Sequence, residues 1–542
     1  MTEEREPQLR KNGADGIGSD DPAGSGADFS GAASGVPTAH PAPELAERAA
    51  ALRIAVIGGG IGGLVAANEC AAVGMHVTVF ERSDAPGGAV RRGEADGLSF
   101  DAGAESFATR GGHVRALVDD LGIGDRVVDA APGGAWVAGF PGGPAPLPQG
   151  GLLGIPENPF ADDVRRVIGW SGAWRAYLDR VRPPLTIGHD RSLGRLVRKR
   201  MGERVLDRLV APISTGVYSA HPDDIDTDAA APALNAALTR VGSLSGAVAV
   251  IRGDGAGKTP GAAVQGLDGG MSTLVDALVA RLGLLGAEVR TEAGVEALER
   301  TDRGWIVRPE SSAEEPAESA TADVAADTAE SAGPEVFDAV VVAVDEGAAR
   351  RLLSPHAPGL DAVAAAGSPR IEIVTLVLDA PALDAAPRGS GVLTVPGTGA
   401  AKALTHSTAK WPWLRRAAGS RHVVRVSFGS QGEDPATASL DDDAAAALAL
   451  AEASALLGVA LDPSALRGSH RSRFVQAQPA AVLGAAERRD RAAKAIEAVP
   501  SLAATGAWLA GTGLAQVVPH ARTAADGLRH ALLWGDGTAS AG

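Results

Sequence analysis

Apolar and polar positions near the N-terminus change period in a way that predicts two strands joined by a helix. Residues 53–57 (RIAVI) form a short apolar run, which is typical of a buried parallel strand. Alanine-rich helical sequence follows over residues 62–73, and Gly74 is a suitable residue just beyond a helix end. Residues 76–80 (HVTVF) predict a second strand. This order predicts a βαβ unit of the kind that binds nucleotides.

Glycines stand where the first strand turns into the helix. Gly58, Gly60 and Gly63 satisfy the pattern G-x-G-x-x-G. In that pattern the first glycine permits the tight turn, the second lets a pyrophosphate approach the backbone, and the third lets helix and strand pack closely. Glu81 follows the second strand, where a ribose-binding carboxylate belongs. A glycine-rich turn without a ligand is the alternative, and the complete order of elements argues against it.

A second glycine pair, Gly87 and Gly88, follows in the segment APGGAVR. A nicotinamide-dependent dehydrogenase would not need this pair. The pattern resembles the second motif of the large flavin oxidase superfamily, with Arg91 offering charge to a phosphate or to the flavin. In the next stretch, LSFDAGAESFATR, residues 103–106 would line the flavin ring. The resemblance therefore implies FAD as the dinucleotide.

The rest of the chain predicts an α/β fold: a discontinuous FAD-binding Rossmann-like domain of the amine-oxidase type, a mixed-sheet substrate domain and a helical subdomain. Strand-like TDRGWIVRP and FDAVVVAV predict neighbours in one sheet, and alternating segments between 365 and 475 predict a largely antiparallel sheet. The expected boundaries are a disordered tail at 1–50, the FAD-binding domain at 51–110, 259–360 and 481–542, the helical subdomain at 111–220, the substrate domain at 221–258 and 361–480, and a disordered acidic insertion at 311–335.

Composition narrows the possible partners. The chain has 542 residues and a formal charge of −16, of which residues 1–50 and 311–335 carry −5 and −7. No basic stripe with interleaved aromatic residues is present, so nucleic acid is not expected as a partner. The chain has a polar N-terminus, one cysteine and no apolar stretch of eighteen residues, which predicts a cytoplasmic protein without a transmembrane segment. Basic residues over 195–204 suggest peripheral membrane contact or, more simply, a solvated helix face.

Three segments of the middle region carry a more specific resemblance: PLPQGGLLGIP, MGERVLDRLVAPISTGVYSAHPDDI and KALTHSTAKWPWL. They resemble the FAD-dependent protoporphyrinogen/coproporphyrinogen oxidases of haem biosynthesis, and the likeness runs from about residue 53 to 535. Within that family the chain is most similar to the bacterial coproporphyrinogen III oxidases that form coproporphyrin III. The resemblance implies a six-electron oxidation with O2 as acceptor and H2O2 as product. It also makes a ferrochelatase-type enzyme a candidate downstream partner.

Carrying the family's FAD contacts over gives candidate residues along the whole chain. The predicted cofactor-binding residues are Gly58, Gly59, Gly60, Ile61, Gly62, Gly63, Glu81, Arg82, Gly87, Gly88, Ala89, Arg91, Ala102, Gly103, Ala104, Glu105, Val295, Phe474, Gln516, Val517 and Val518. Two departures from the family pattern are Ala515, where a glycine is common, and Phe474, where a tryptophan is usual.

Candidate substrate contacts follow from the charge of the expected substrate. Coproporphyrinogen III carries four propionates, so cationic partners are needed, and Lys410 and Arg110 are the candidates. An exposed surface cation is the competing interpretation of each. No Ser/His/Asp or Cys/His arrangement is apparent, so no catalytic base and no metal site are predicted.

Three other functions stay open at this point. A protoporphyrinogen IX oxidase would share every motif. A flavin amine oxidase would line the flavin with aromatic residues, and only two tyrosines in the chain argue against it. A cofactor-free binding protein of the same fold is opposed by the intact glycine motifs.

Overall fold

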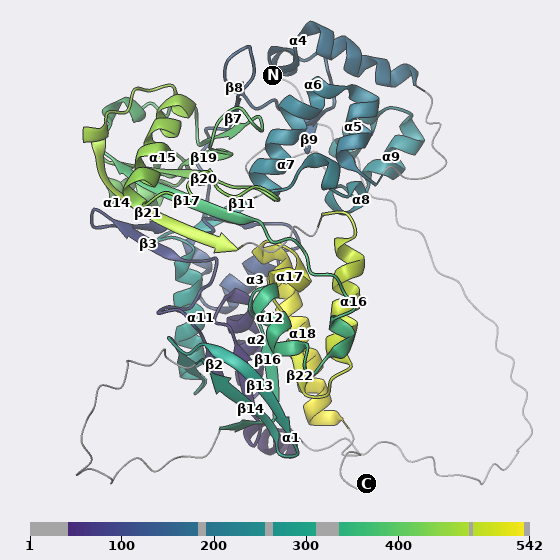
Figure 1. Cartoon of the computed structure of the whole chain (residues 1–542), viewed down its shortest axis with the longest axis vertical. Coiled ribbons are helices and arrows are strands. Elements are labelled where there is room, and N and C mark those ends of the chain that lie inside the picture. The colour runs from purple at the N-terminus through teal and green to yellow at the C-terminus, as the bar shows by residue number, and fades with distance from the viewer. Residues whose placement is uncertain (1–41, 183–190, 255–263, 311–334, 476–480, 536–542) are drawn as a thin grey trace, which may run out of the picture.

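The computed structural model describes residues 42–182, 191–254, 264–310, 335–475 and 481–535 (Figure 1). Most of the predicted tail and of the acidic insertion therefore lies outside the described residues. Residues 42–50, which we expected in the tail, form helix α1 (Ala42–Ala50), and Ala49 is buried against the core. Glu335, expected in the insertion, forms ion pairs with Arg53 and Arg290.

A five-stranded parallel sheet forms the lower part of the molecule in Figure 1, in the order β12-β2-β1-β16-β22. Its strands come from three distant parts of the chain: β1 (Arg53–Ile57), β2 (His76–Phe80), β12 (Glu288–Arg290), β16 (Ala339–Val342) and β22 (Leu502–Ala504). All three parts were assigned to the FAD-binding domain from the sequence.

Both faces of this sheet are buried, because alternate side chains of each strand point to opposite sides. In β1, Ile54 and Val56 face a core made with α2 (Ile61–Ala71), α3 (His113–Asp120), α11 (Ser272–Leu284) and α18 (Leu514–Trp534). Ala55 and Ile57 face a second core made with α12 (Glu346–Leu353) and α16 (Ala485–Glu497). The apolar run in the sequence is therefore explained by burial on two sides.

The strands on either side of the acidic insertion lie in one sheet, as the sequence predicts, but the strand that follows them belongs to another sheet. β14 (Gly304–Pro309) pairs with β13 (Val295–Thr301) and β15 (Val336–Phe337) in a small antiparallel sheet. Immediately after β15, the chain enters the parallel sheet as β16. The apolar segment FDAVVVAV thus supplies two short strands to two different sheets.

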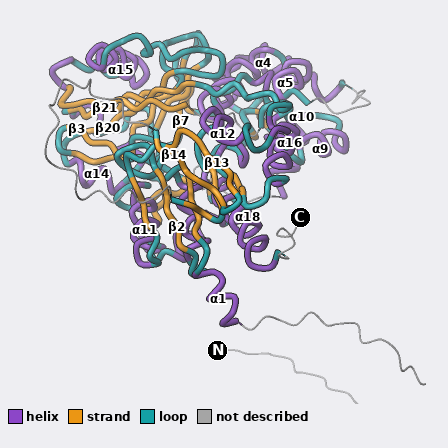
Figure 2. The backbone as a smooth tube through the Cα atoms, turned by 60° about the horizontal axis from the view of Figure 1, so that its bottom comes forward, coloured by secondary structure: helices purple, strands orange, loops and turns teal. Residues whose placement is uncertain are grey.

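A seven-stranded sheet forms the second layer, in the order β21-β17-β20-β19-β18-β7-β8. Its strands are β7 (Ala135–Ala138), β8 (Ala145–Pro146), β17 (Arg370–Leu378), β18 (Gly391–Thr394), β19 (Ala403–His406), β20 (His422–Phe428) and β21 (Leu466–Val475). Helix α15 (Asp442–Leu457) covers one face. The pairing is antiparallel except between β18 and β7. Figure 2 shows the strands as two groups, one with β20, β21 and β7 and the other with β2, β13 and β14.

The helical subdomain differs from its predicted extent at both ends. β7 and β8, which we expected within it, belong to the seven-stranded sheet, whereas residues 221–254, which we expected in the substrate domain, are helical. Its main helices are α4 (Asp162–Tyr177), α5 (Leu193–Met201), α7 (Ala211–Tyr218), α9 (Leu234–Val241) and α10 (Leu244–Asp254). A π-helical turn, Leu206–Val210, leads directly into α7.

Short elements connect the three parts. They are β3 (Arg92–Ala95), β4 (Leu98–Asp101), β5 (Phe107–Ala108), β6 (Val127–Asp129), β9 (Gly151–Leu152), β10 (Ile155–Pro156), α6 (Glu203–Val205), α8 (Thr227–Ala230), β11 (Val264–Leu267), α13 (Ser407–Lys410), α14 (Pro412–Ala418) and α17 (Ala507–Ala510). No one helix of the described chain meets the length and hydropathy of a membrane span, although α9 and α10 meet them as a pair bent by 115°.

Candidate functional site

The G-x-G-x-x-G turn lies at the carboxyl edge of the parallel sheet, between β1 and α2. Gly58 has a φ of +107°, and a Cβ there would lie 2.7 Å from the carbonyl oxygen of Ala343. A Cβ at Gly63 would collide with the carbonyl oxygen of Gly58. Both glycines are therefore required by the backbone itself, as the motif predicts.

Gly60 differs from its two neighbours in the motif. A Cβ at Gly60 would meet no heavy atom of the described protein within 4 Å. Gly60 is also the N-cap of α2, and no side chain caps that helix end. Open space beside uncapped helix N–H groups suits a phosphate, which both the N–H groups and the helix dipole attract. The residues present therefore fit the pyrophosphate of a dinucleotide.

Glu81 lies at the same edge of the sheet, directly after the end of β2. Its Oε2 accepts a hydrogen bond from the Gly59 N–H at 2.7 Å, and its Oε1 accepts one from the Ser83 N–H at 2.9 Å. The carboxylate is thus held beside the glycine turn, where the ribose of a bound dinucleotide is expected. Arg82, predicted beside it, is exposed and forms an ion pair with Glu310 at 2.8 Å.

The second glycine pair lies directly against the first turn. Gly87 donates its N–H to the Gly59 carbonyl at 2.8 Å, and Gly60 and Gly87 form a parallel bridge. A Cβ at Gly88 would lie 3.2 Å from the Gly60 Cα. Two backbones meet here without side chains between them, so the segment 87–91 forms a second wall of the nucleotide site. This close approach explains why the chain has a second glycine pair.

The same segment leads to the stretch expected to line the flavin. The Ala104 N–H donates to the Ala89 carbonyl at 2.9 Å, and a Cβ at Gly103 would collide with that carbonyl. The Ala102 N–H donates to the Arg91 carbonyl at 2.9 Å, while the Arg91 side chain reaches Ser83 Oγ at 3.4 Å. The backbone of 87–91 therefore joins the phosphate turn to the flavin-lining residues 102–105.

Two further predicted contacts converge on this region from distant parts of the chain. A Cβ at Gly103 would lie 3.3 Å from the ring of Phe474, at the end of β21. A Cβ at Gly62 would lie 3.3 Å from Val517 Cγ1, in the first turns of α18. Val518 is buried and Gln516 is partly exposed. Val295 packs in the second core of the parallel sheet, and its contact with the adenosine stays a prediction.

A buried ionic cluster forms around Glu105, within the stretch that is expected to line the flavin. Glu105 Oε1 accepts from Lys410 Nζ at 2.5 Å, and Oε2 accepts from Arg425 Nη1 at 2.9 Å and from Ser407 Oγ at 3.2 Å. The exposed fractions of the Glu105, Lys410 and Arg425 side chains are 11%, 19% and 7%. Burial raises the pKa of Glu105, but Lys410 and Arg425 outweigh it and hold that pKa at about 2. Glu105 is therefore ionised throughout the physiological range.

Arg425 connects this cluster to the flavin-lining backbone, because its Nη2 also donates to the Gly103 carbonyl. Neither Arg425 nor Ser407 was among the predicted site residues. An arginine within the apolar strand HVVRVSF was the available signal, since a charged residue is almost never buried without a partner. Its partner lies 320 residues away in the sequence, which no local pattern reveals.

Burial shifts the pKa values of two titratable groups near the cluster. Burial raises the pKa of Asp101 to about 7, partly offset by the charge of Arg425, and Asp101 Oδ1 accepts from the Met271 N–H at 2.8 Å. Burial, with the charges of His422 and Arg415, lowers the pKa of His406 to about 4. Among the described residues, no group of three or more His, Cys, Asp or Glu side chains could hold a metal ion.

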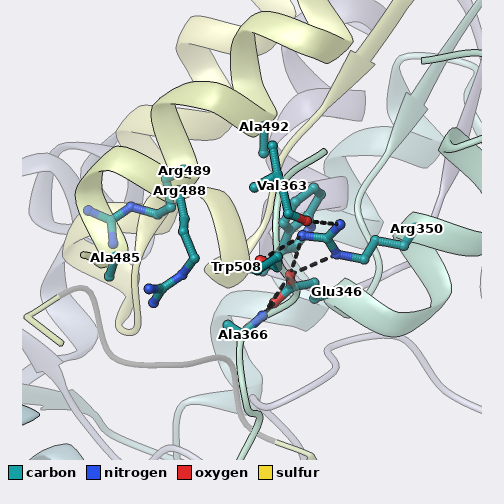
Figure 3. Close-up of a pocket in the computed structure, with 10 residues that line it drawn as sticks. Glu346, Arg350, Val363, Ala366, Ala485, Arg488, Arg489, Ala492 and Trp508 are labelled. Atoms are coloured by element: carbon teal, nitrogen blue, oxygen red, sulfur yellow. Dashed lines mark hydrogen bonds and ion pairs between the residues drawn. The ribbon is translucent and has the colours of Figure 1, made fainter. Parts of the chain in front are cut away.

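The hollow shown in Figure 3 is separate from the glycine turns and lies between α12 and α16. Arg350 pairs with Glu346 there at 2.9 Å and donates to the carbonyls of Leu360 and Val363. The Ala366 N–H donates to both Glu346 oxygens. These groups hold α12 against the loop that follows it, so we assign the Glu346–Arg350 network to the fold.

The basic helix α5 does not form a free patch. Arg198 binds Asp223 at 2.9 Å, and Arg200 forms a buried ion pair with Asp179. Arg195 and Lys199 are exposed. Large apolar side chains are instead exposed at the end of α4 and just beyond it, after a kink at Gly169, where φ is +71°. This α4 stripe consists of Trp170, Trp174, Leu178 and Val181, exposed by 62%, 57%, 49% and 72%.

The protein-family model described as flavin containing amine oxidoreductase matches residues 61–528. The coproporphyrinogen III oxidase of Mycobacterium tuberculosis is 31% identical over 483 residues, which cover 88% of this chain and 97% of the relative. That of Propionibacterium freudenreichii is 29% identical over 87% of this chain and 90% of the relative. The mitochondrial protoporphyrinogen oxidase of Nicotiana tabacum is 27% identical over 36% of this chain and 39% of the relative.

Solved structures show the same fold at lower identity. A protein from Exiguobacterium sp. 255-15, whose name refers to protoporphyrinogen oxidase, superposes with a TM-score of 0.73 at 22% identity, over 88% of this chain and 98% of that one. Putrescine oxidase bound to putrescine has a TM-score of 0.57 at 15% identity, over 89% and 98%. Proteins named for a porphyrinogen and for an amine thus share this architecture, so the fold alone does not decide the substrate.

Proposed function

The chain belongs to the flavin-containing amine oxidoreductase family and binds FAD, and from this premise we propose that it oxidises coproporphyrinogen III to coproporphyrin III with O2 as the acceptor. The observation that carries the proposal is the match to relatives named coproporphyrinogen III oxidase along nearly their whole length. In the proposed reaction the substrate loses six electrons and six protons in three rounds. Each round reduces one O2 to H2O2.

The roles of the protein follow from the site geometry. FAD, when bound, supplies the acceptor for a hydride from a substrate carbon. Gly60 and the start of α2 would hold the pyrophosphate, and Glu81 would bind the ribose. Arg425 binds the Glu105 carboxylate and the Gly103 carbonyl, which holds the backbone of the flavin-lining residues 103–105 in one position. A rigid wall of this kind favours a reproducible distance between substrate and cofactor.

The cofactor assignment is tested by Gly60→Val. The branched side chain would fill the space that we assign to a phosphate, so the variant should be colourless when the parent is yellow. Gly283→Val is the matched control, because a Cβ at Gly283 in α11 also meets no atom within 4 Å but lies away from the glycine turns. Stoichiometric FAD in the Gly60 variant, measured by absorbance, would contradict the site.

The substrate assignment is tested by assaying two porphyrinogens side by side. Protoporphyrinogen IX has two propionates where coproporphyrinogen III has four. A site that pairs one extra propionate gains a charge-assisted hydrogen bond of roughly 1.5–3 kcal/mol, which corresponds to about tenfold or more in kcat/KM. We therefore expect higher kcat/KM for coproporphyrinogen III, with about three H2O2 formed per porphyrin. Equal or faster turnover of protoporphyrinogen IX would favour the alternative oxidase.

Amine oxidation is the second function to test, because putrescine oxidase shares the fold. Neither tyrosine of the chain lies in the flavin-lining stretch: Tyr177 ends α4, and Tyr218 ends α7. We therefore expect no H2O2 from putrescine or other amines. Amine-dependent H2O2 without porphyrinogen turnover would overturn the proposed substrate class.

Peripheral membrane contact is proposed for the α4 stripe. Arg165 lies over the Trp170 ring at 4.1 Å, and Arg180 lies over the Tyr177 ring at 5.3 Å. Exposed tryptophans next to arginines suit the interface of an anionic membrane. A variant carrying both Trp170→Ser and Trp174→Ser should sediment less with phosphatidylserine-containing vesicles than the wild type. Equal sedimentation of both proteins would contradict this contact.

A further inference from the structure

Lys402 holds an unusual position between the seven-stranded sheet and the helical subdomain. It immediately precedes β19, and its backbone N–H donates to the Ser427 carbonyl at 2.9 Å. Its side chain reaches the C-cap of α7, where Nζ donates to Ser219 Oγ at 2.7 Å. α7 packs against the seven-stranded sheet, because a Cβ at Gly216 in α7 would lie 2.6 Å from Leu393 Cδ2 in β18.

The Lys402 ammonium has no carboxylate partner among the described residues. Within the described residues its one hydrogen-bond partner is Ser219 Oγ, which is neutral. An ammonium has three donors, so two remain without a protein acceptor. Burial alone lowers the pKa of Lys402 to about 8, with no opposing charge to raise it. Lys199 and Lys494, by comparison, are exposed, and Lys410 is paired with Glu105.

The groups around Lys402 are polar but not acidic. The Gln431 N–H donates to the Ser219 carbonyl at 3.0 Å, and Gln431 Oε1 is buried without a hydrogen-bond partner. Tyr218 precedes Ser219 in the sequence. Burial raises the pKa of Tyr218, and the nearby charge of Arg110 lowers that pKa by a smaller amount. Glu433 is exposed and accepts from Ser430 Oγ at 3.1 Å. Two cations, Arg110 and Lys402, therefore flank the end of α7 without an ion-pair partner in the described structure.

The position of Lys402 relative to the flavin-lining wall follows from α7. Lys402 Nζ contacts Ser219, the residue directly after Tyr218. Tyr218 lies near Arg110, which follows Glu105 by five positions in the sequence. Lys402 and the residues that follow the flavin-lining stretch therefore meet at the C-terminal end of α7.

We propose that Lys402, with Ser219 and Gln431, binds one carboxylate of the substrate. The inference rests on the proposed function, and it assigns a propionate to this position. A partly buried cation without a counter-charge is unfavourable, and an arriving carboxylate would supply the missing charge and hydrogen-bond acceptors. An amide can turn its NH2 group toward the same carboxylate, which would give Gln431 a partner as well.

The test compares Lys402→Met with Lys402→Arg and with Lys199→Met, a charge-removing control on the exposed face of α5. Kinetics would be measured on coproporphyrinogen III and protoporphyrinogen IX, and the affinity for coproporphyrin III would be measured by its fluorescence. We expect Lys402→Met to lower kcat/KM and product affinity for the four-carboxylate ligand by roughly tenfold or more. Turnover of the two-carboxylate substrate should fall by less, and Lys402→Arg should recover most of the loss.

Stability and FAD content separate this role from a structural one. Removing an unpaired buried charge should leave the Tm equal or higher and the FAD absorbance unchanged. Equal losses on both substrates with a lower Tm would show a structural lysine and overturn the inference, as would unchanged kinetics. Wild-type protein that neither oxidises coproporphyrinogen III nor binds coproporphyrin III would overturn the proposed function itself. Normal wild-type turnover with an unaffected Lys402→Met would overturn only the Lys402 assignment.

Discussion

Two lysines on either side of β19 occupy opposite electrostatic environments. Lys410 forms an ion pair with Glu105 at 2.5 Å, and Arg425 binds the same carboxylate. Lys402 is largely enclosed as well, but its ammonium contacts a serine hydroxyl and no acid of the described chain. The protein therefore neutralises one cation internally and leaves the other available. A charge that is already paired can position a wall of the site, whereas an unpaired one can attract an anionic ligand.

This difference bears directly on the sequence-based choice of Lys410 as a substrate contact. Lys410 is neither an exposed surface cation nor a free one, since its side chain is 19% exposed and paired. Its contact with a propionate stays a prediction, and it would require Glu105 to share the ammonium with the substrate.

The largest effect is expected from Glu105→Gln. This change leaves Lys410 and Arg425 buried without a counter-charge, and breaking a buried ionic group in this way costs about 3–5 kcal/mol in the free energy of unfolding. Urea unfolding would measure the change. Glu299→Gln is the matched control, because Glu299 pairs with Arg308 on the surface at 48% and 50% exposure, and loss of an exposed pair should leave the stability nearly unchanged. Similar losses in both variants would show that the buried cluster has no special role.

The second effect is a pH-dependent difference in the free energy of unfolding between Lys402→Met and the wild type. Burial lowers the pKa of Lys402 from 10.5 to about 8, so the folded state binds fewer protons than the unfolded state between these values. The free energy of unfolding of the wild type should therefore rise between about pH 8 and pH 10.5. Below pH 8 the charged Lys402 should lower that free energy by about 3 kcal/mol. The methionine variant should be more stable than the wild type at pH 7 and equal to it near pH 11. A difference independent of pH would contradict an unpaired Lys402.

The third effect is expected from Lys410→Met. Glu105 keeps its bond to Arg425, so the loss should be smaller than in Glu105→Gln, about 1.5–3 kcal/mol for one charge-assisted hydrogen bond. If Lys410 acts only through Glu105, turnover of both porphyrinogens should fall by the same factor. A selective loss on coproporphyrinogen III would instead support direct contact with a propionate.

The smallest effect is expected from Arg110→Ala, because Arg110 is exposed and an exposed ion pair contributes about 0.2–1 kcal/mol. We expect kcat/KM for coproporphyrinogen III to fall by at most about fivefold. The Tm should stay unchanged, since no ion pair of Arg110 is lost from the described structure. A loss as large as that of Lys402→Met would show that Arg110 becomes buried when substrate binds.

The nucleotide turn was predictable because its determinants are local. Gly58, Gly60, Gly63 and Glu81 lie within 24 residues, and each has a backbone or ligand requirement that shows in the sequence. The second glycine pair follows within seven residues of Glu81 and packs against the first turn. Short-range requirements of this kind leave a readable pattern.

The ionic cluster and the Lys402 position were not predictable in the same way. Arg425 meets Glu105, and Lys402 meets Ser219, only because of how the two sheets and α7 pack together. β7 and β8 were missed because strands of four and two residues carry little periodicity. The sequence also predicted that FDAVVVAV lies in one sheet, whereas the structure divides it between two. This apolar run gives no sign that its first residue pairs in one sheet and the following residues pair in another.

The parallel sheet has a consequence for how the protein is made. Strands β1 and β2 end by Phe80, but the edge strand β22 begins only at Leu502. During synthesis at about 5–20 residues per second, the first strands wait roughly 20–80 s for this last neighbour. Until Ala339–Val342 is made, the β1 edge lacks its neighbour β16, and β16 then has an unpaired edge for roughly 8–32 s until β22 follows. We expect the nascent chain to need protection by chaperones until the ribosome releases it, and to acquire its flavin only afterwards.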